Sequence, residues 1–319
     1  MIGRIGTLRR AIVAFLIALA LHGVGTTLIE GYSSEFSIRS LLVLATLLGV
    51  ACIGQTLVVL LGGIDLSIPF VIGFANVVAA KLYGGGMNFI VVALIVGVLA
   101  VAIGALNGAL SSRLCVHPLI VTLGVGTAVQ GAVLLWTAGF PTGSAPDAVN
   151  QFVSIGGQVG PLPVPAVVPS FLVVALLIGV MLHLTPFGRR LYAVGSNPVA
   201  APLALIDPHW MWTAAYALSA VFAALAGVLL LGFTGSAYGD VGQPYLFQTI
   251  AAVVIGGTTL VGGRGGILGT VAGALVLTEI NTLLIGLGLT PALVQAALGF
   301  VIIVLVSLYG REPHVSTTI

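Results

Sequence analysis

The chain is too apolar to fold as a soluble domain. Of its 319 residues, 59% are hydrophobic and 6% are charged (10 Lys and Arg, 8 Asp and Glu), with a mean hydropathy of +1.23. A soluble domain usually carries about a quarter charged residues. The composition therefore predicts an integral membrane protein whose surroundings are a lipid bilayer, and we expect no nucleic-acid partner.

About ten apolar stretches are long enough to cross a membrane as helices. A hydrocarbon core of about 30 Å takes roughly 20 residues, because every backbone N–H and C=O must be paired within the segment. The fold class expected is an all-α, polytopic transmembrane bundle of about ten spans that forms a single domain over 1–319, or eight spans if two short stretches are re-entrant. The stretches run approximately over 11–29, 40–61, 66–82, 88–110, 118–138, 167–184, 211–233, 245–261, 267–287 and 291–309.

The basic residues predict how the chain is oriented. Threading ten spans from a cytoplasmic N-terminus leaves only Arg39 and Lys81 outside, as the positive-inside rule requires. This predicts a multi-pass membrane protein with both termini in the cytoplasm. The first stretch also resembles a secretory signal with a cleavage site near Ala18-Leu19-Ala20, but its apolar run continues to Ile29 and favours a retained helix. The residues placed inside are Arg4, Arg9, Arg10, Arg113, Arg189, Arg190, Arg264 and Arg311.

Two long loops interrupt the apolar pattern. The loop at about 139–166 is rich in Pro and Gly and falls outside, whereas the loop at about 186–210 falls inside and contains two arginines. An inside loop with its own short helix is typical of a contact with another protein. Cys52 and Cys115 suggest neither a disulfide nor a zinc site.

Two glycine clusters are the sharpest local motifs. Gly62, Gly63, Asp65 and Ser67 join the second and third stretches with almost no polar spacer. Glycine frees the backbone to turn, and Asp or Ser can cap the following helix. Capping at the membrane edge and a role in a transport pathway both remain open for Asp65.

The second cluster extends from Gly256 and Gly257 to Gly266. It lacks the ending of a nucleotide-binding loop, and close packing of backbones is the better interpretation. An apolar run leads from Gln55-Thr56 into the first cluster, and another leads from Gln248-Thr249 into the second. This short match indicates a duplicated half with broken or re-entrant helices, or arises by chance.

Polar side chains inside the spans are candidates for a solute pathway. Each is also explained by hydrogen bonds between helices. Glu279 stands apart, because an ionised carboxylate within a span is costly unless it meets water or a partner; it either lines a cavity or reaches the outer interface. The candidates are Gln55, Asn76, Asn107, Gln248, Thr249 and Glu279.

The chain resembles the permease subunits of ATP-binding-cassette sugar importers of the ribose, xylose, arabinose and galactoside type. The resemblance runs from about Ser40 to Tyr309 and is carried by Gly62 to Ser67, by Phe187 to Pro198, and by Ile250 to Gly257 with its continuation through Thr270. It implies a transport subunit of a bacterial inner membrane, without catalytic residues, metal or cofactor. The implied partners are a second permease, identical or related, two cytoplasmic ATPase subunits and a periplasmic solute-binding protein.

The resemblance also implies a coupling helix that contacts the ATPase, around Asn197 to Ile206. The family usually reads Ala-Ala-Arg-Leu-Ser-Gly-Ile here, where this chain has Ala200-Ala201-Pro202-Leu203-Ala204-Leu205-Ile206. The loss of the Arg and the Gly hints at a heterodimer whose partner keeps the usual sequence. The coupling residues expected are Asn197, Ala200, Ala201, Leu203 and Ile206.

The function expected is import of a monosaccharide or related small polar solute. Alternatives are a permease for branched-chain amino acids or a sugar-like signal molecule, and, less favoured, a secondary transporter, which would need paired charges near the midplane. A membrane enzyme is disfavoured, because the histidines are scattered and no catalytic constellation falls at one depth.

Overall fold

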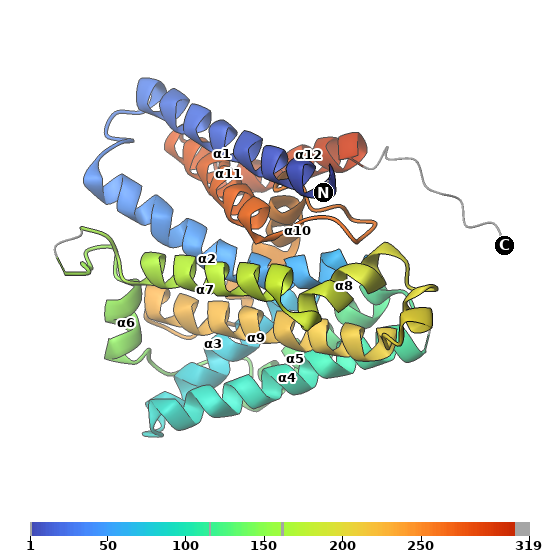
Figure 1. Cartoon of the computed structure of the whole chain (residues 1–319). Coiled ribbons are helices and arrows are strands. Elements are labelled where there is room, and N and C mark those ends of the chain that lie inside the picture. Colours follow the sequence, from blue (N-terminus) through green and yellow to red (C-terminus); the bar gives the residue numbers. More distant parts are fainter. Residues whose placement is uncertain (1, 115, 161–162, 310–319) are drawn as a thin grey trace.

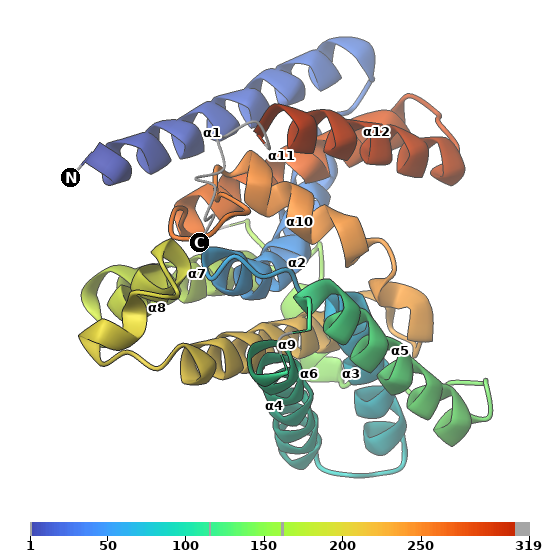
Figure 2. The ribbon, with the colours of Figure 1, turned by 90° about the vertical axis from the view of Figure 1, so that its right-hand side faces the viewer.

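The protein is a bundle of helices (Figures 1 and 2). The computed structural model describes residues 2–114, 116–160 and 163–309. Those residues form α1 (Ile2–Leu28), α2 (Glu35–Leu60), α3 (Ile68–Gly84), α4 (Phe89–Arg113), α5 (Pro118–Thr137), α6 (Asp147–Val153), α7 (Val167–Leu184), α8 (Pro186–Ser196), the 3-10 helix η1 (Ala201–Ala204), α9 (Pro208–Thr234), the 3-10 helix η2 (Gly239–Gly242), α10 (Tyr245–Ile255), α11 (Ile267–Gly286) and α12 (Pro291–Tyr309).

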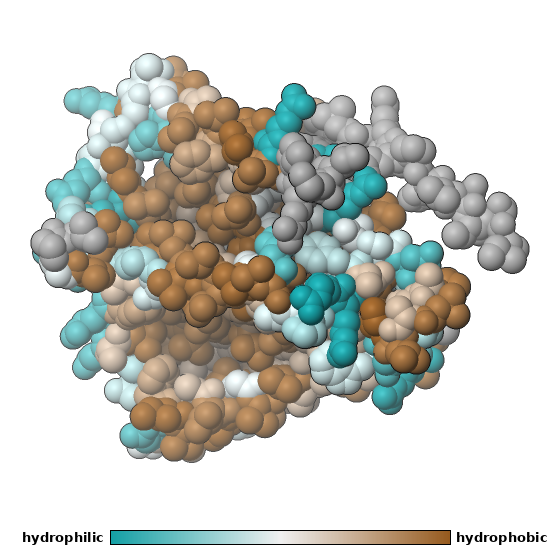
Figure 3. All heavy atoms as spheres, in the orientation of Figure 1, coloured by the Kyte–Doolittle hydropathy of each residue, from teal (hydrophilic) through white to brown (hydrophobic). Residues whose placement is uncertain are grey.

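The all-helical membrane fold predicted from composition is confirmed. Within the described residues, seven helices are long and apolar enough to cross a bilayer: α1, α2, α4, α5, α7, α9 and α11. Each of the ten predicted stretches coincides with one helix, and α3 and α12 add apolar helices of 17 and 19 residues. Figure 3 shows the broad apolar surface that such a bundle presents to lipid.

The stretch predicted at 245–261 is shorter than expected. Its helix, α10, ends at Ile255 after 11 residues, which corresponds to about 17 Å of rise. That length is only about half of a hydrocarbon core. Gly256 and Gly257 end the helix, so α10 is a partial span followed by a turn.

Helices α2 and α9 form the centre of the bundle. In the most apolar stretch of α2, 89% of the residues are buried, and in that of α9 72% are buried, against 22% in α1, α4 and α5. The N-terminus of α9 is capped by Asp207, whose Oδ1 accepts from the N–H of His209 at 2.8 Å. The outer helices therefore face lipid or another subunit, and the polar side chains of α2 and α9 lie inside.

Helix α4 packs against α9 through two glycines four residues apart. A Cβ at Gly108 would lie 2.6 Å from the Cα of Thr213, and one at Gly104 would lie 2.7 Å from the Cα of Ala217. Such spacing of small residues lets two backbones approach closely in a membrane, where packing rather than the hydrophobic effect drives association.

The connections between helices gather at two ends of the bundle (Figure 1). We call one the basic end: it holds the start of α1, the α4–α5 connection, the 185–207 segment and the α10–α11 connection. The opposite end holds the connections at 29–34, 85–88 and 138–166. Figure 2 looks onto the basic end. The basic end contains the segments with Arg9, Arg10, Arg113, Arg189, Arg190 and Arg264, whereas Arg311 lies outside the described residues.

Candidate functional site

The turn after α2 is built around Gly62. Its φ is +81°, in the left-handed region that favours glycine. The N–H of Gly62 donates to the carbonyl oxygen of Val59 at 2.9 Å, and that of Gly63 donates to Val58 at 3.1 Å. This pair of bonds is the Schellman ending of a helix, and it reverses the chain into the short connection that carries Asp65.

Helix α10 ends in the same way. Gly257 has a φ of +87°, and the N–H groups of Gly257 and Thr258 donate to Val254 and Val253 at 2.8 and 3.1 Å. When the two turns are aligned, Gly257 is equivalent to Gly62. In that alignment the Gln248-Thr249 pair lies two residues away from the position equivalent to Gln55-Thr56. The same ending also closes α3, so the predicted duplication stays a prediction.

The two glycine turns contact each other and the end of α8. The N–H of Gly263 donates to the carbonyl oxygen of Leu60 at 2.9 Å. A Cβ at Gly195 would overlap this same oxygen and would lie 2.9 Å from the nitrogen of Gly263. Only glycine fits at 195. We call residues 60–63, 195–196 and 261–263 the glycine junction, because backbone from three distant segments meets there without side chains between.

Asp65 lies buried beside this junction, with 1% of its surface exposed. Its Oδ1 accepts from the N–H of Ser67 at 2.9 Å and from the Ser67 hydroxyl at 2.5 Å. Its Oδ2 accepts from the hydroxyl of Ser219 in α9 at 2.7 Å. Asp65 therefore bonds to Ser67, the residue just before α3, and the same carboxylate ties the start of α3 to the central helix. The Ser67 side chain makes no capping bond to α3, and capping by Asp65 stays a prediction.

Neighbouring helices also hold the Asp65 connection. The Asn107 side-chain amide in α4 donates to the Ser67 hydroxyl at 2.8 Å, and the Thr122 hydroxyl in α5 accepts from the N–H of Leu66 at 3.0 Å. The Tyr216 hydroxyl of α9 donates to the carbonyl oxygen of Ile64 at 3.3 Å. The connection is thus fixed to three helices, and the side-chain oxygens of Asp65 and Ser67 have partners although they are buried.

Among the pathway candidates, Gln55 differs from the rest. It is fully buried in α2, and neither its amide nitrogen nor its amide oxygen has a hydrogen-bond partner. An unpaired buried amide is costly unless water or a ligand reaches it. Of the six candidates, Gln55 would therefore gain most from a hydrogen bond to a solute or a water molecule.

The other candidates have structural partners or are partly exposed. Asn76 accepts from the N–H of Tyr238 at 2.9 Å, and the Thr249 hydroxyl donates to the carbonyl oxygen of Tyr245 at 3.0 Å in its own helix. Gln248 is half-buried on α10. The structure does not gather the six candidates in one cluster: Asn107 joins the Asp65 connection, and Glu279 lies elsewhere.

Glu279 joins α11 to α1 and to the connection after α1. Its Oε2 accepts from the Tyr32 hydroxyl at 2.8 Å, and its Oε1 lies 3.0 Å from Nδ1 of His22. Nε2 of His22 lies 3.2 Å from the Ser33 hydroxyl. Burial, and then the hydrogen bond to Glu279, raise the pKa of Tyr32 above its usual value, so it stays a protonated donor. We call His22, Tyr32 and Glu279 the α1 clamp.

The cytoplasmic coupling helix predicted at 197–206 is not where it was expected. The α-helix is α8, which ends at Ser196, and residues 201–204 form only η1. Pro198 disfavours helix at Asn197, whose φ and ψ are −157° and 95°. The Asn197 side chain instead accepts from the N–H of Ala200 at 2.9 Å. The segment is therefore a turn with one short 3-10 helix and contains no α-helix.

The turn at 197–206 presents apolar side chains to the outside. Leu203 and Leu205 are 88% and 95% exposed, and Val199 is 81% exposed. Ala201 is buried and anchors the turn, whereas Ile206 is half-buried. An apolar knob at the basic end, beyond the membrane-spanning helices, is typical of a surface that another protein covers.

Sequence reasoning missed several partners in these networks. Ser219, Tyr216 and Thr122 come from helices distant in sequence from Asp65, and nothing in their local pattern announces the contact. For the α1 clamp one signal was present. His22 is a polar residue within an apolar stretch, as Glu279 is, and two such residues at the same end of neighbouring helices can pair.

Comparisons with known proteins place the chain among permeases. A family model described as branched-chain amino acid transport system / permease component matches residues 37–307. The chain is 33% identical over 282 residues to the ribose import permease protein RbsC of Bacillus subtilis (strain 168), covering 88% of this chain and 87% of the relative.

Two further relatives extend the comparison. The chain is 32% identical over 306 residues to the fructose import permease protein FrcC of Rhizobium meliloti, covering 93% of this chain and 84% of the relative. It is 31% identical over 265 residues to the autoinducer 2 import system permease protein LsrD of Escherichia coli (strain SMS-3-5 / SECEC), covering 81% and 79%. No solved structure matches the chain.

Proposed function

The chain belongs to the family described as branched-chain amino acid transport system / permease component, and on that basis we propose that it is the permease subunit of an ATP-driven sugar importer. The solute would be a monosaccharide or related small polar molecule. The chain itself would supply the membrane pathway and no chemistry. ATP hydrolysis would take place in cytoplasmic ATPase subunits, and a periplasmic binding protein would deliver the solute.

The glycine junction is the observation that supports a mechanism for this function. It joins the end of α8 directly to the end of α2 and, through residues 261–263, to the connection after α10. An ATPase that moves the 197–206 turn would therefore move Gly195 against Leu60 and Gly263. Shifts of packed backbone between discrete arrangements are a usual route by which one site drives another.

The solute class rests on the relatives and on the polarity of the core. Two relatives are named as import permeases for ribose and for fructose. A buried, unpaired amide such as that of Gln55 suits the hydroxyl groups of a sugar better than the side chain of a branched amino acid. The autoinducer 2 relative keeps a sugar-like signal molecule as the second candidate.

The pathway would run beside α2, where Gln55 lacks a partner, and the second permease would complete it. After Gln55, the residues that we expect to contact the solute are Gln248 of α10 and the neighbouring Thr249. The Asp65 connection would hold the start of α3 to α4, α5 and α9 rather than act as a solute ligand, because its carboxylate oxygens are already paired. The positions of the arginines support a cytoplasmic basic end.

The exposed turn at 197–206 provides the test. In the assembled transporter, changing Leu203→Asp together with Leu205→Asp places two charges where an apolar groove of the ATPase should be, so the ATPase should dissociate or hydrolyse ATP without import. Val159→Asp, in the loop at the opposite end, is the control and should leave the complex intact. Co-purification of the ATPase and uptake of labelled ribose or fructose are measured; normal assembly and uptake in the double variant would refute the proposal.

A further inference from the structure

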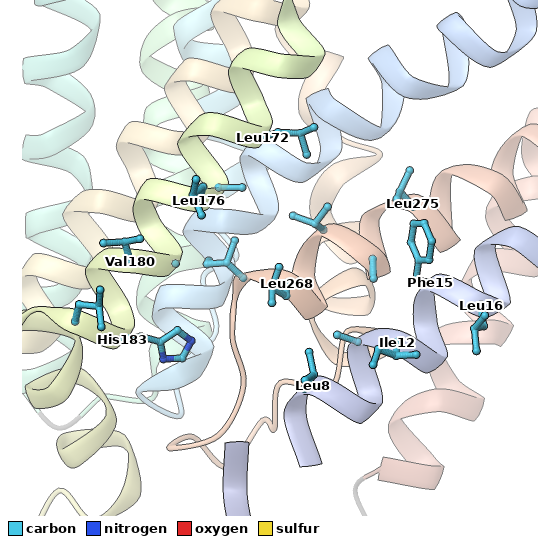
Figure 4. Close-up of a pocket in the computed structure, with 17 residues that line it drawn as sticks. Leu8, Ile12, Phe15, Leu16, Leu172, Leu176, Val180, His183, Leu268 and Leu275 are labelled. Atoms are coloured by element: carbon cyan, nitrogen blue, oxygen red, sulfur yellow. The ribbon is translucent and has the colours of Figure 1, made fainter. Parts of the chain in front are cut away.

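An apolar cleft opens on the outside of the bundle between α1, α7 and α11 (Figure 4). Its volume is about 840 Å³. Small residues make room for it, namely Gly179 in α7 and Ala272 in α11, and large apolar side chains such as Phe15 and Leu176 border it. The α1 clamp, which holds α1 against α11 near the opposite end of these helices, maintains one wall of the cleft.

The length of the cleft matches one leaflet of a bilayer. Along α7 it extends from Leu172 to Leu184, which corresponds to about 18 Å of helix. One leaflet of the hydrocarbon core is about 15 Å deep. The cleft therefore runs from the basic end to about the middle of the membrane, where an acyl chain lying in it would end.

The cleft becomes polar at the basic end. A second cavity of about 280 Å³ adjoins it there and shares Leu8, His183 and Ile267 with it. Its lining includes the backbone of Gly265 and Gly266, and the Tyr192 ring stacks on His183 at 6.1 Å. The aliphatic cleft thus leads into a space that suits a hydrated head group.

The charge around this mouth has one sign. Arg9 and Arg264 are exposed and lie next in sequence to residues that line the two cavities, and Arg189 lies on the first turns of α8 just beyond α7. No Asp or Glu occurs in the three stretches 8–16, 172–190 and 264–275 that form the walls and the mouth. The mouth therefore favours an anionic group.

We propose that this cleft binds one anionic phospholipid, with an acyl chain between α1, α7 and α11 and the phosphate at the arginine-rich mouth. An empty crevice beside lipid would forfeit van der Waals contacts along its walls, and a flexible acyl chain restores them. The lipid would fill the gap between α1 and α7 and so fix the position of the helix that precedes the family match.

A second copy of the chain fits the cleft less well. In a symmetric dimer the same patch faces itself, so the arginine-rich mouths of the two copies would be brought together. Like charges at such distances repel. An anionic head group instead neutralises the mouth, which is why lipid is the occupant the charges favour.

The test fills the cleft with a side chain. The purified full-length chain is stripped of lipid and titrated with phosphatidylglycerol or phosphatidylcholine, and binding is read by native mass spectrometry. Gly179→Trp places an indole in the cleft and should weaken phosphatidylglycerol binding by about fivefold or more, as much as the loss of one arginine contact. Gly97→Trp in α4 is the matched control, because a Cβ at either glycine meets nothing within 4 Å.

The charge of the mouth is tested separately. Arg264→Gln should weaken phosphatidylglycerol binding about fivefold and leave phosphatidylcholine binding unchanged. Arg113→Gln removes the same charge at the basic end of the bundle, from the last residue of α4, and should not change the binding of either lipid. Equal affinity of the wild type for both lipids, or equal loss in Gly179→Trp and Gly97→Trp, would overturn the proposal.

A final arm examines occupancy by a second copy. Leu176→Cys, in a chain with Cys52 and Cys115 replaced by Ala, is oxidised in phosphatidylglycerol vesicles. A lipid bound in the cleft should prevent this cysteine from forming a disulfide with a second copy of the chain. Efficient disulfide-linked dimers would assign the cleft to an interface between two copies and would contradict lipid binding.

Discussion

Gly263 donates its backbone N–H to the carbonyl oxygen of Leu60 at 2.9 Å, and this bond joins the turn after α10 to the end of α2. Gly195 packs against the same carbonyl oxygen. One peptide group of α2 therefore contacts both the second glycine cluster and the segment that leads to the exposed turn at 197–206. Substitutions at these contacts should affect coupling before they affect the solute site.

Gly195→Ala should uncouple the transporter. The added Cβ overlaps the carbonyl oxygen of Leu60, and relieving that overlap should cost about 1–3 kcal/mol of stability and displace α8. Thermal unfolding and solute-stimulated ATP hydrolysis of the assembled complex measure the two effects. Gly124→Ala in α5, where a Cβ meets nothing within 4 Å, is the matched control and should change neither quantity. Wild-type coupling in Gly195→Ala would remove the junction from the mechanism.

Asp65→Ala should destabilise the bundle strongly. It leaves the hydroxyls of Ser67 and Ser219 and the N–H of Ser67 without their acceptor in a buried site. Hydrogen bonds to a charged group contribute about 1.5–3 kcal/mol each, so we expect a loss of about 2–5 kcal/mol.

Unfolding of the purified chain in mild detergent measures this loss. The control is Glu30→Ala, an exposed acid outside the helices, which should stay within about 0.5 kcal/mol of the wild type. A similar small change for Asp65→Ala would mean that the carboxylate does not hold α3 to α9.

Tyr32 and Glu279 should be energetically coupled. A double-mutant cycle with Tyr32→Phe and Glu279→Gln should give an interaction energy of about 1 kcal/mol, since each change removes the same 2.8 Å hydrogen bond or weakens it. The comparison cycle pairs Glu279→Gln with Tyr238→Phe, a partly exposed tyrosine with no contact to Glu279, and should be additive within about 0.5 kcal/mol. Additivity in both cycles would show that the α1 clamp contributes nothing to holding α1.

The pathway can be mapped with cysteines introduced singly in a background lacking Cys52 and Cys115. We expect a small water-soluble thiol reagent to modify at least two of the five positions, to an extent that changes when ATP binds, because alternating access changes which depth is wet. Gln248 should react most readily in the arrangement described here, because the other four side chains are fully buried. If no cysteine reacted with the reagent in any state, these residues would pack the helices together and would not line the pathway. The positions are Gln55, Asn76, Asn107, Gln248 and Thr249.

Much of the architecture follows from elementary properties of the sequence. Each apolar stretch became a helix because backbone pairing in a membrane leaves no other choice, and Gly62 and Gly257 ended α2 and α10 because only glycine takes the left-handed turn easily. The length of α10 was overestimated, since apolar residues continue past Ile255 and hydropathy does not register where the backbone turns.

The three-dimensional contacts were beyond the sequence pattern. Asp65 is buried beside Ser219, which belongs to a helix about 150 residues later in the chain, and no local pattern predicts that contact. The coupling segment was misplaced for a local reason, because Pro198 and Pro202 exclude the α-helix that the resemblance implied. For Glu279 the sequence does not indicate the partners, because His22 lies on α1 and Tyr32 in the connection that follows it.

The absence of side chains between Leu60, Gly195 and Gly263 has a mechanical consequence. A side chain that separates two segments can rotate to another rotamer and so absorb a small displacement, whereas a peptide group pressed against a peptide group has no such freedom. The contact should therefore resist compression. A displacement of the chain at residue 195 should be transmitted almost fully to the helix that ends at residue 60.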